Sequence, residues 1–184
     1  MENKTRCKWC NQKNRLYTAY HDTEWGVPRF DDAYLYEMLI LESFQAGLSW
    51  ECVLNKREAF RKAYDGFDAA AVASFGEEKI NELLGNADII RNRLKIKASV
   101  KNSRIFLDIV REYGSFCEYL RTFTKGVTIY ENDKISNALS DAVSKDLTGR
   151  GMSFVGSVVI YSYLQAIGVI YSHQNECFLY KSGE

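Results

Sequence analysis

The sequence predicts an all-α protein, and three observations support this fold class. The 184 residues include a single proline, Pro28, the residue that most often interrupts helices. Apolar residues recur with helical spacing in segments that end at glycines. One short stretch, GVTIY at 126–130, has the composition of a strand. We therefore expect residues 1–184 to form a single unit of interleaved helical lobes around a substantial core.

The expected helices follow one another along most of the chain. Their approximate ranges are 32–46, 50–64, 68–74, 77–84, 90–113, 115–123, 137–149 and 156–171. Asp68 and Ser136 are the expected N-caps, since short polar side chains accept hydrogen bonds from the first free N–H groups of a helix. The glycines expected just beyond helix ends are Gly66, Gly85, Gly114 and Gly151. We expect the N-terminal residues to be extended and to wrap onto this helical unit.

Composition excludes several classes of protein. Apolar residues make up 46% of the chain and aromatic residues 14%, as in a folded globular protein. The formal net charge is zero, so any nucleic-acid-binding surface must be local. Five scattered cysteines and an N-terminus without an apolar run argue against a secreted protein. The most apolar run, 154–171, is interrupted by glycines and polar residues and is therefore expected to be a core helix, not a membrane span. We expect a cytoplasmic location and no membrane partner.

Glu42 is a carboxylate in an otherwise apolar helix. It lies four residues after Met38 and three after Leu39, on the same helical face. A charged group buried there is costly unless it is paired, hydrogen-bonded or protonated. Glu42 is therefore a candidate functional residue.

Cysteines and histidines gather at both ends of the chain. CKWC carries Cys7 and Cys10 and is followed by His21, while HQNEC carries His173 and Cys177. The C-x₂-C and H-x₃-C spacings are typical of zinc sites, and thiolate with imidazole favours zinc over hard cations. By spacing alone, either Cys10 or His21 completes a set with the other three residues. With no open coordination position evident, we expect a structural zinc that joins the two termini.

A basic stretch follows a glycine-containing turn. Between Asp88 and Asp108 there is no acidic residue, and the sequence includes Arg91, Arg93, Lys95 and Lys97. A helix N-terminus with flanking cations suits a phosphate, as in a helix-hairpin-helix element. Taken alone, this stretch is explained slightly better as a solvated basic helix face.

Aromatic residues are frequent in the N-terminal part of the chain. They are Trp9, Tyr17, Tyr20, Trp25 and, beyond the helix of Glu42, Trp50. Aromatic rings beside a buried carboxylate suit a flat, cationic or hydrogen-bond-donating heterocycle. Tyr20, Trp50 and Glu42 could together hold an extruded base.

Several segments together closely resemble the 3-methyladenine DNA glycosylase I family. They are YTAYHDTEWGVP (17–28), LESFQAGLSWECVL (41–54), IIRNRLKI (89–96), GMSFVGSVVIYSYLQAIG (151–168) and the final HQNEC. The similarity runs in the same order from about Cys7 to Cys177, nearly the whole chain. YHDTEWG followed by LESFQAGLSW is highly specific.

The resemblance implies a helix-hairpin-helix glycosylase fold with a structural zinc. By motif position the zinc ligands would be Cys7, His21, His173 and Cys177, with Cys10 beside the site. The DNA-binding hairpin would span about 80–97, where Asp88 replaces a glycine common in the family. That negative charge would not favour a phosphate.

The resemblance also implies roles for the residues around Glu42. Glu42 would contact the damaged base and would carry any catalytic contribution. Tyr20 and Trp50 would be pocket aromatics, with Trp9, Tyr17 and Trp25 as pocket walls. Leu48 would approach the gap left by the extruded base.

The implied activity belongs to base-excision repair. The enzyme would hydrolyse the bond between N9 of an alkylated adenine and C1′ of deoxyribose, releasing free 3-methyladenine from double-stranded DNA without cleaving the strand. N3-alkylated adenine is cationic and leaves without prior protonation, so no strong general acid is needed. We expect Glu42 to be ionised when the base is bound and to accept hydrogen bonds from its amino edge. Neutral charge and compact size suit a monomer.

Overall fold

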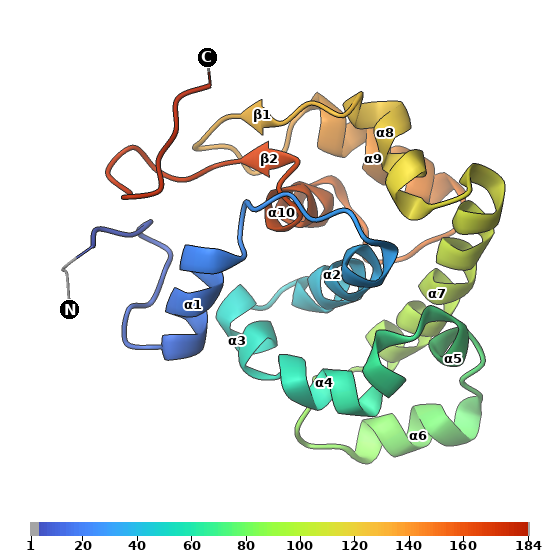
Figure 1. The fold of residues 1–184 in the computed structure, drawn as a ribbon. Helices are drawn as coiled ribbons and strands as arrows, with labels where there is room; N and C mark the ends of the chain where they lie inside the picture. Colours follow the sequence, from blue (N-terminus) through green and yellow to red (C-terminus); the bar gives the residue numbers. More distant parts are fainter. Residues whose placement is uncertain (1–3, 184) are drawn as a thin grey trace.

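The computed structural model describes residues 4–183, which form a mostly helical fold. Two helices at its centre, α2 (Asp32–Gln45) and α10 (Ser157–Ala166), pack against each other (Figure 1). From Tyr34 to Phe44 every residue of α2 is buried. Asp31 caps its first turn by accepting a hydrogen bond from the Tyr34 N–H. The predicted helical fold and the predicted burial of the Glu42 helix are thus confirmed.

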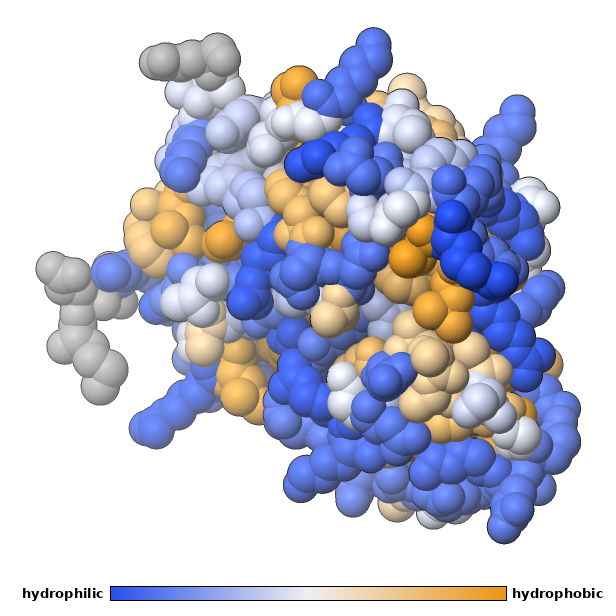
Figure 2. All heavy atoms as spheres, turned by 45° about the vertical axis from the view of Figure 1, so that its right-hand side comes forward, coloured by the Kyte–Doolittle hydropathy of each residue, from blue (hydrophilic) through white to orange (hydrophobic). Residues whose placement is uncertain are grey.

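The remaining helices surround this pair. After α2 come α3 (Trp50–Asn55), α4 (Arg57–Ala63), the short 3₁₀ turn η1 (Asp65–Phe67), α5 (Ala69–Ala73) and α6 (Glu77–Gly85). The long α7 (Arg93–Tyr113) packs against α5 and α8 (Phe116–Thr124), and α9 (Ala138–Gly149) packs against α10. The face turned forward in Figure 2 is largely hydrophilic, with hydrophobic side chains in several patches. Within residues 4–183, no helix is both long and apolar enough to cross a membrane.

Several predicted boundaries are corrected. The N-terminal residues include a helix, α1 (Arg15–Thr23), whose N-cap Asn14 accepts hydrogen bonds from Leu16 and Tyr17 N–H. The helix expected at 50–64 is broken at Lys56, and the one expected from 90 begins at Arg93 because Asn92 caps it. The last helix ends at Ala166 instead of 171.

The predicted caps are partly correct. Asp68 caps α5, and Gly114 ends α7 in the left-handed conformation. Asn137 caps α9 in place of Ser136, since its side chain accepts from the Ser140 N–H. Gly85 is the last residue of α6 and does not have a positive φ. Gly66 and Gly151 do, with φ of 70° and 102°.

A small parallel sheet joins distant segments near the C-terminus. The strand expected within 126–130 is β1 (Ile129–Tyr130), which pairs with β2 (Ile170–Tyr171). The chain reaches β2 through Gly168, which has φ of 78° and packs directly on Pro28: an added Cβ would lie 2.4 Å from the proline nitrogen. Gly26 N–H also bonds to the Gln165 carbonyl, so the segment after α1 is fixed across the end of α10. The N-terminal residues and the segment after β2 also meet, because the Phe178 N–H bonds to the Thr5 carbonyl (Figure 1).

Candidate functional site

A buried cluster of two cysteines and two histidines joins the chain ends. One ligand atom from each of Cys7, His21, His173 and Cys177 lies within 4.8 Å of the others. The Sγ atoms of Cys7 and Cys177 each lie 3.5 Å from His173 Nδ1, and Cys177 Sγ lies 3.5 Å from His21 Nε2. Tetrahedral zinc with thiolate and imidazole bonds of about 2.0–2.3 Å requires ligand atoms roughly 3.3–3.8 Å apart. The cluster therefore has the donors and the spacing of a metal site.

Neighbouring groups orient these ligands. His21 Nδ1 lies 2.8 Å from Asp22 Oδ1, and Asp22 is in turn held by Arg6. Cys7 Sγ accepts from the Gln174 N–H at 3.4 Å, and Cys177 Sγ accepts from the Leu179 N–H at 3.5 Å. Such outer contacts fix the histidine tautomer and stabilise thiolates in metal sites.

Burial sets the protonation of the free ligands. It lowers the pKa of His21, and lowers that of His173 to about 4, so both imidazoles are neutral and able to bind a metal at pH 7. It raises the pKa of Cys7 to about 12. Desolvation disfavours the thiolate form of Cys7. A metal cation that binds the thiolates displaces their protons and offsets this desolvation.

The geometry resolves the choice between Cys10 and His21. Cys10 is buried beside the cluster, but its Sγ lies 3.8 Å from the Tyr17 carbonyl and takes no part in the group of four. His21 enters the cluster because α1 is a helix and places His21 on its buried side. The cluster of Cys7, His21, His173 and Cys177 agrees with the ligand set implied by the family resemblance.

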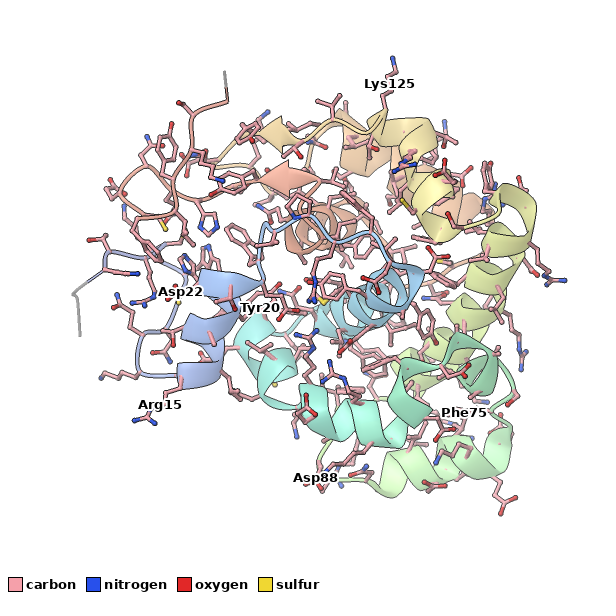
Figure 3. The ribbon with its side chains drawn as sticks, in the orientation of Figure 1. Arg15, Tyr20, Asp22, Phe75, Asp88 and Lys125 are labelled. Carbon is pink, nitrogen blue, oxygen red and sulfur yellow. The ribbon has the colours of Figure 1, made fainter. Side chains whose placement is uncertain are left out.

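A cavity of about 350 Å³ lies between α1, α2, α3 and α10. All six residues expected to bind the base line it: Trp9, Tyr17, Tyr20, Trp25, Glu42 and Trp50. Figure 3 shows Tyr20 on the side of α1 that faces α2 and α3. The structure thus brings together the aromatic residues and the carboxylate.

Glu42 is 2% exposed, and its Oε2 atom has no hydrogen-bond partner in the described chain. Burial raises its pKa well above the ordinary value of 4.5. Trp50 Nε1, another buried atom of this cavity, likewise lacks an acceptor among residues 4–183. Buried polar atoms nearly always find partners in folded proteins. One acceptor and one donor without partners in a single cavity indicate a ligand that supplies both.

Rings form the walls of the cavity. Tyr20 and Trp50 have centroids 5.4 Å apart at an angle of 45°. Trp9 packs on Tyr17 at 5.3 Å and edge-on against Trp25 at 4.8 Å. This arrangement offers aromatic surface to a planar molecule beside the Glu42 carboxylate.

The metal cluster and the cavity share a wall. Trp25 lies edge-on to His173 with centroids 4.8 Å apart, and Trp9 lies 5.2 Å from His21. Asn132 Nδ2 also donates to the His173 carbonyl at 3.3 Å, and the next two residues, Asp133 and Lys134, line the cavity. The two histidines of the cluster therefore support the Trp9 and Trp25 rings that line the cavity.

Several cavity residues were not predicted from the sequence. They are Gln45, Asp133, Lys134, Ser162, Gln165, Ser172 and Gln174. Gln45 lies three residues after Glu42, so helical spacing could have identified it. Ser162 and Gln165 are polar residues in the apolar α10 segment, which is the same kind of signal as Glu42. Asp133 and Lys134 come from a loop without a recognisable pattern.

The predicted DNA-contacting residues fall into three groups. Leu48 follows α2 and is 42% exposed. Arg91, Arg93 and Lys97 are also exposed, but Glu77 forms ion pairs with Arg93 at 2.8 Å and with Lys97 at 2.5 Å. Lys95 belongs to neither group.

Lys95 corrects the prediction of an exposed basic face. It is only 7% exposed, and its Nζ donates to the carbonyl oxygens of Phe44 at 2.8 Å and Ala46 at 2.5 Å. Lys95 faces inward because position 95 belongs to the side of α7 that packs on α2. An ammonium group bonded in this way is not free for a phosphate.

Asp88 lies at the turn between α6 and α7 (Figure 3). Its N–H donates to Asn86 Oδ1 at 2.9 Å, and it does not adopt a positive φ. An aspartate therefore fits this turn without left-handed strain.

Known proteins agree with this geometry along nearly the whole chain. The model of the methyladenine glycosylase family matches residues 9–180. DNA-3-methyladenine glycosylase 1 of Escherichia coli (strain K12) is 42% identical over 182 residues, which are 95% of this chain and 96% of that protein.

Solved structures are equally similar. A crystal structure of 3-methyladenine DNA glycosylase I has a TM-score of 0.92 and 40% identity, covering 96% of this chain and all of the other. A variant of 3-methyladenine DNA glycosylase I in complex with 3-methyladenine has a TM-score of 0.89 and 31% identity, covering 94% and 96% of the two chains. The sequence, the fold and the cavity lead to one conclusion: this chain belongs to the methyladenine glycosylase family.

Proposed function

We propose that the protein is a DNA-3-methyladenine glycosylase, which removes alkylated adenine from DNA by hydrolysing its N-glycosidic bond. The observation that carries this proposal is the Glu42 carboxylate, buried without a partner for Oε2 in an aromatic cavity. Family membership and a relative that binds 3-methyladenine support it. The substrate is alkylated double-stranded DNA, and the products are free 3-methyladenine and an abasic site.

Glu42 recognises the positive charge and the amino edge of the base. In the free protein, burial raises the pKa of Glu42 and favours its neutral form. A cationic adenine reverses this preference, because an adjacent positive charge stabilises the carboxylate. Each charge-assisted hydrogen bond contributes about 1.5–3 kcal/mol. Unmodified adenine is neutral and gains much less, which is a physical basis for selectivity.

Stacking and extrusion have comparable energies. Flipping a nucleotide out of the duplex costs a few kcal/mol. Stacking on Tyr20 and Trp50 returns about 1–3 kcal/mol for each ring. Trp9, Tyr17 and Trp25 complete the cavity wall and exclude water. Because these two energies nearly cancel, the added attraction between a cationic base and Glu42 determines whether extrusion is favourable.

The chemical step needs little assistance from the protein. An N3-alkylated adenine leaves with the electrons of the C1′–N9 bond, which neutralises its charge, and water adds to C1′ with loss of a proton. The motif residues that line the cavity include no lysine, and Lys134 at its rim is paired with Glu131 at 2.6 Å. We therefore expect no lysine to attack C1′ and the strand to stay intact. Glu42 holds the leaving base in its cavity, and this is its catalytic contribution.

DNA is held at the turn between α6 and α7 and at Leu48. Arg91, Arg93 and Lys97 bind phosphates once duplex DNA displaces Glu77 from Arg93 and Lys97. The exposed Leu48 fills the gap left by the extruded nucleotide. Residues 80–97 act as the DNA-binding hairpin. The protein acts as a monomer in the cytoplasm.

Cys7, His21, His173 and Cys177 hold a structural zinc. The donor types and their spacing support this assignment. The ion crosslinks the two ends of the chain and leaves no coordination position for substrate. The residues around it serve the reaction by supporting Trp9 and Trp25.

The decisive test is an excision assay on methylated duplex DNA. The purified protein should release free 3-methyladenine, and the DNA strand should stay intact until it is treated with alkali. Binding of methylated DNA without base release would instead indicate a non-catalytic sensor of alkylated bases.

A further inference from the structure

The buried Lys95 caps the C-terminus of α2. The last carbonyl groups of a helix have no partner within the helix. Here Lys95 Nζ donates to two of them, those of Phe44 and Ala46, at 2.8 and 2.5 Å. Ala46 itself is no longer helical, with φ of −44° and ψ of 114°. The ammonium group thus satisfies carbonyls that would otherwise be buried without donors.

These carbonyls lie between the two residues that act on the extruded nucleotide. Phe44 comes two residues after Glu42, and Ala46 comes two residues before Leu48. Lys95, in contrast, belongs to the first turn of α7, directly after the turn proposed to hold the DNA backbone. Its side chain therefore connects the backbone-binding element to the segment that carries Glu42 and Leu48.

A second lysine makes the reciprocal connection. Lys56 lies between α3 and α4, and its Nζ donates to the carbonyls of Ala87 at 3.2 Å and Asp88 at 3.0 Å. Figure 3 shows Asp88 at this turn, close to the α3–α4 segment. Residues 44–56 are thus bound to residues 87–95 at both ends, with one lysine contributed from each side.

Burying an ammonium group is an expensive way to end a helix. Desolvation disfavours the charged form and lowers the pKa of Lys95. Within residues 4–183, its Nζ bonds to main-chain carbonyls and forms no ion pair. A glycine cap or exposure to water would satisfy the same carbonyls without this cost. The burial of the Lys95 ammonium group therefore indicates that the end of α2 must be held in a fixed position relative to α7.

We propose that Lys95 and Lys56 are positioning residues that fix the Leu48 loop relative to the DNA-binding turn. Because the two ammonium–carbonyl bridges set this geometry, phosphates held at the turn place Leu48 and the cavity at the same nucleotide. This inference rests on the proposed function. It adds two residues that touch neither the base nor the DNA.

The test is the substitution Lys95→Met, which keeps the length and the apolar stem and removes the three donors. We expect its single-turnover excision rate at saturating methylated duplex to fall by about tenfold or more, since misplacement by about 1 Å can cost ~10²-fold. Its affinity for free 3-methyladenine, measured by tryptophan fluorescence, should stay close to that of the wild type. A lysine that supports only the cavity would lower both values equally, and that result would overturn the proposal.

Two further variants separate this role from stability. Lys56→Met breaks the second bridge without leaving the helix end of α2 unsatisfied, so it should show the same split if Lys95→Met does not fold. Lys145→Met, an exposed lysine of α9, is the matched control and should excise at the wild-type rate. An unchanged rate in Lys56→Met would refute the proposal. Failure of the wild type to release base would refute the proposed function instead.

Discussion

The cavity around Glu42 and the turn around Arg93 differ in whether their ionisable groups have partners in the protein. In the cavity, the Glu42 carboxylate is buried and its Oε2 has no protein partner. At the turn, Arg93 and Lys97 are exposed and are both paired with Glu77. Both regions are proposed to contact DNA, but only the cavity holds a polar group whose burial is unexplained without a ligand.

This difference shows which observations identify a binding site. A buried polar atom without a partner costs about 1–3 kcal/mol, so a protein that keeps one has a use for it. Exposed ion pairs contribute only about 0–1 kcal/mol, so they form and exchange easily. The cavity is therefore identified by its own structure, whereas the proposal that the basic turn binds phosphate depends on the family resemblance.

The largest expected effect comes from the metal cluster, which supports the cavity but not the turn. His173→Ala should lose the metal and lower the free energy of unfolding by about 4 kcal/mol or more, because the crosslink between the chain ends is lost. Metal analysis and thermal unfolding measure the two effects. Cys10→Ser, a buried cysteine outside the group of four, should keep stoichiometric zinc. Undiminished zinc in His173→Ala would exclude His173 as a ligand.

The next effect concerns Glu42 itself. Glu42→Gln keeps the size of the side chain but removes its charge, so it should fold, retain zinc and lose most excision. Loss of one charge-assisted hydrogen bond predicts a rate about 10- to 100-fold lower on methylated DNA. Glu118→Gln, on the exposed surface of α8, is a matched control that should excise normally. Wild-type rates in Glu42→Gln would contradict the assigned role.

The same substitution should have the opposite effect on stability. Because burial raises the pKa of Glu42 above 4.5, the folded state holds this proton more tightly than the unfolded state. The resulting stability is full below pH 4.5 and falls as the pH rises towards the folded-state pKa. Gln does not titrate, so Glu42→Gln should melt at a higher temperature than the wild type, with a larger gap at pH 8 than at pH 5. Equal differences in melting temperature at the two pH values would show that ionisation of Glu42 does not destabilise the folded protein.

The smallest expected effect is at the turn. Lys97→Met should weaken binding of unmodified duplex and reduce the slope of log affinity against log salt by about 1. Glu77→Gln should instead tighten binding a few-fold, since it frees Arg93 and Lys97 from their exposed ion pairs. Fluorescence anisotropy across a salt series measures both. Unchanged binding in both variants would remove this turn from the DNA interface.

Sequence patterns identified the residues whose chemistry conflicts with their surroundings. Glu42 in an apolar helix and the cysteines beside the two histidines are such cases, and the structure gathers each set into one place. Local pattern failed where tertiary contacts decide. Lys95 and Lys97 are both lysines near the start of α7. Only the packing of α7 on α2 makes Lys95 buried and Lys97 exposed.

Spacing could not choose between Cys10 and His21 for a similar reason. Cys-x₂-Cys is a frequent metal-binding pattern, but the helix from Arg15 to Thr23 places His21 at the cluster. That helix was not predicted, because its short aromatic sequence has a weak apolar pattern and its main signal is the Asn14 cap. The loop residues Asp133 and Lys134 reach the cavity only through the pairing of β1 with β2.

The union of the chain ends also affects how the protein is made. A ribosome produces Cys7 and His21 well before His173 and Cys177. Until the last segment emerges, the cluster of four is incomplete, and Trp25 lacks His173, against which it packs edge-on. A prematurely terminated chain could therefore present its basic turn to DNA without a finished cavity. Translation therefore supplies the histidine that supports Trp25 only after it has supplied the basic turn.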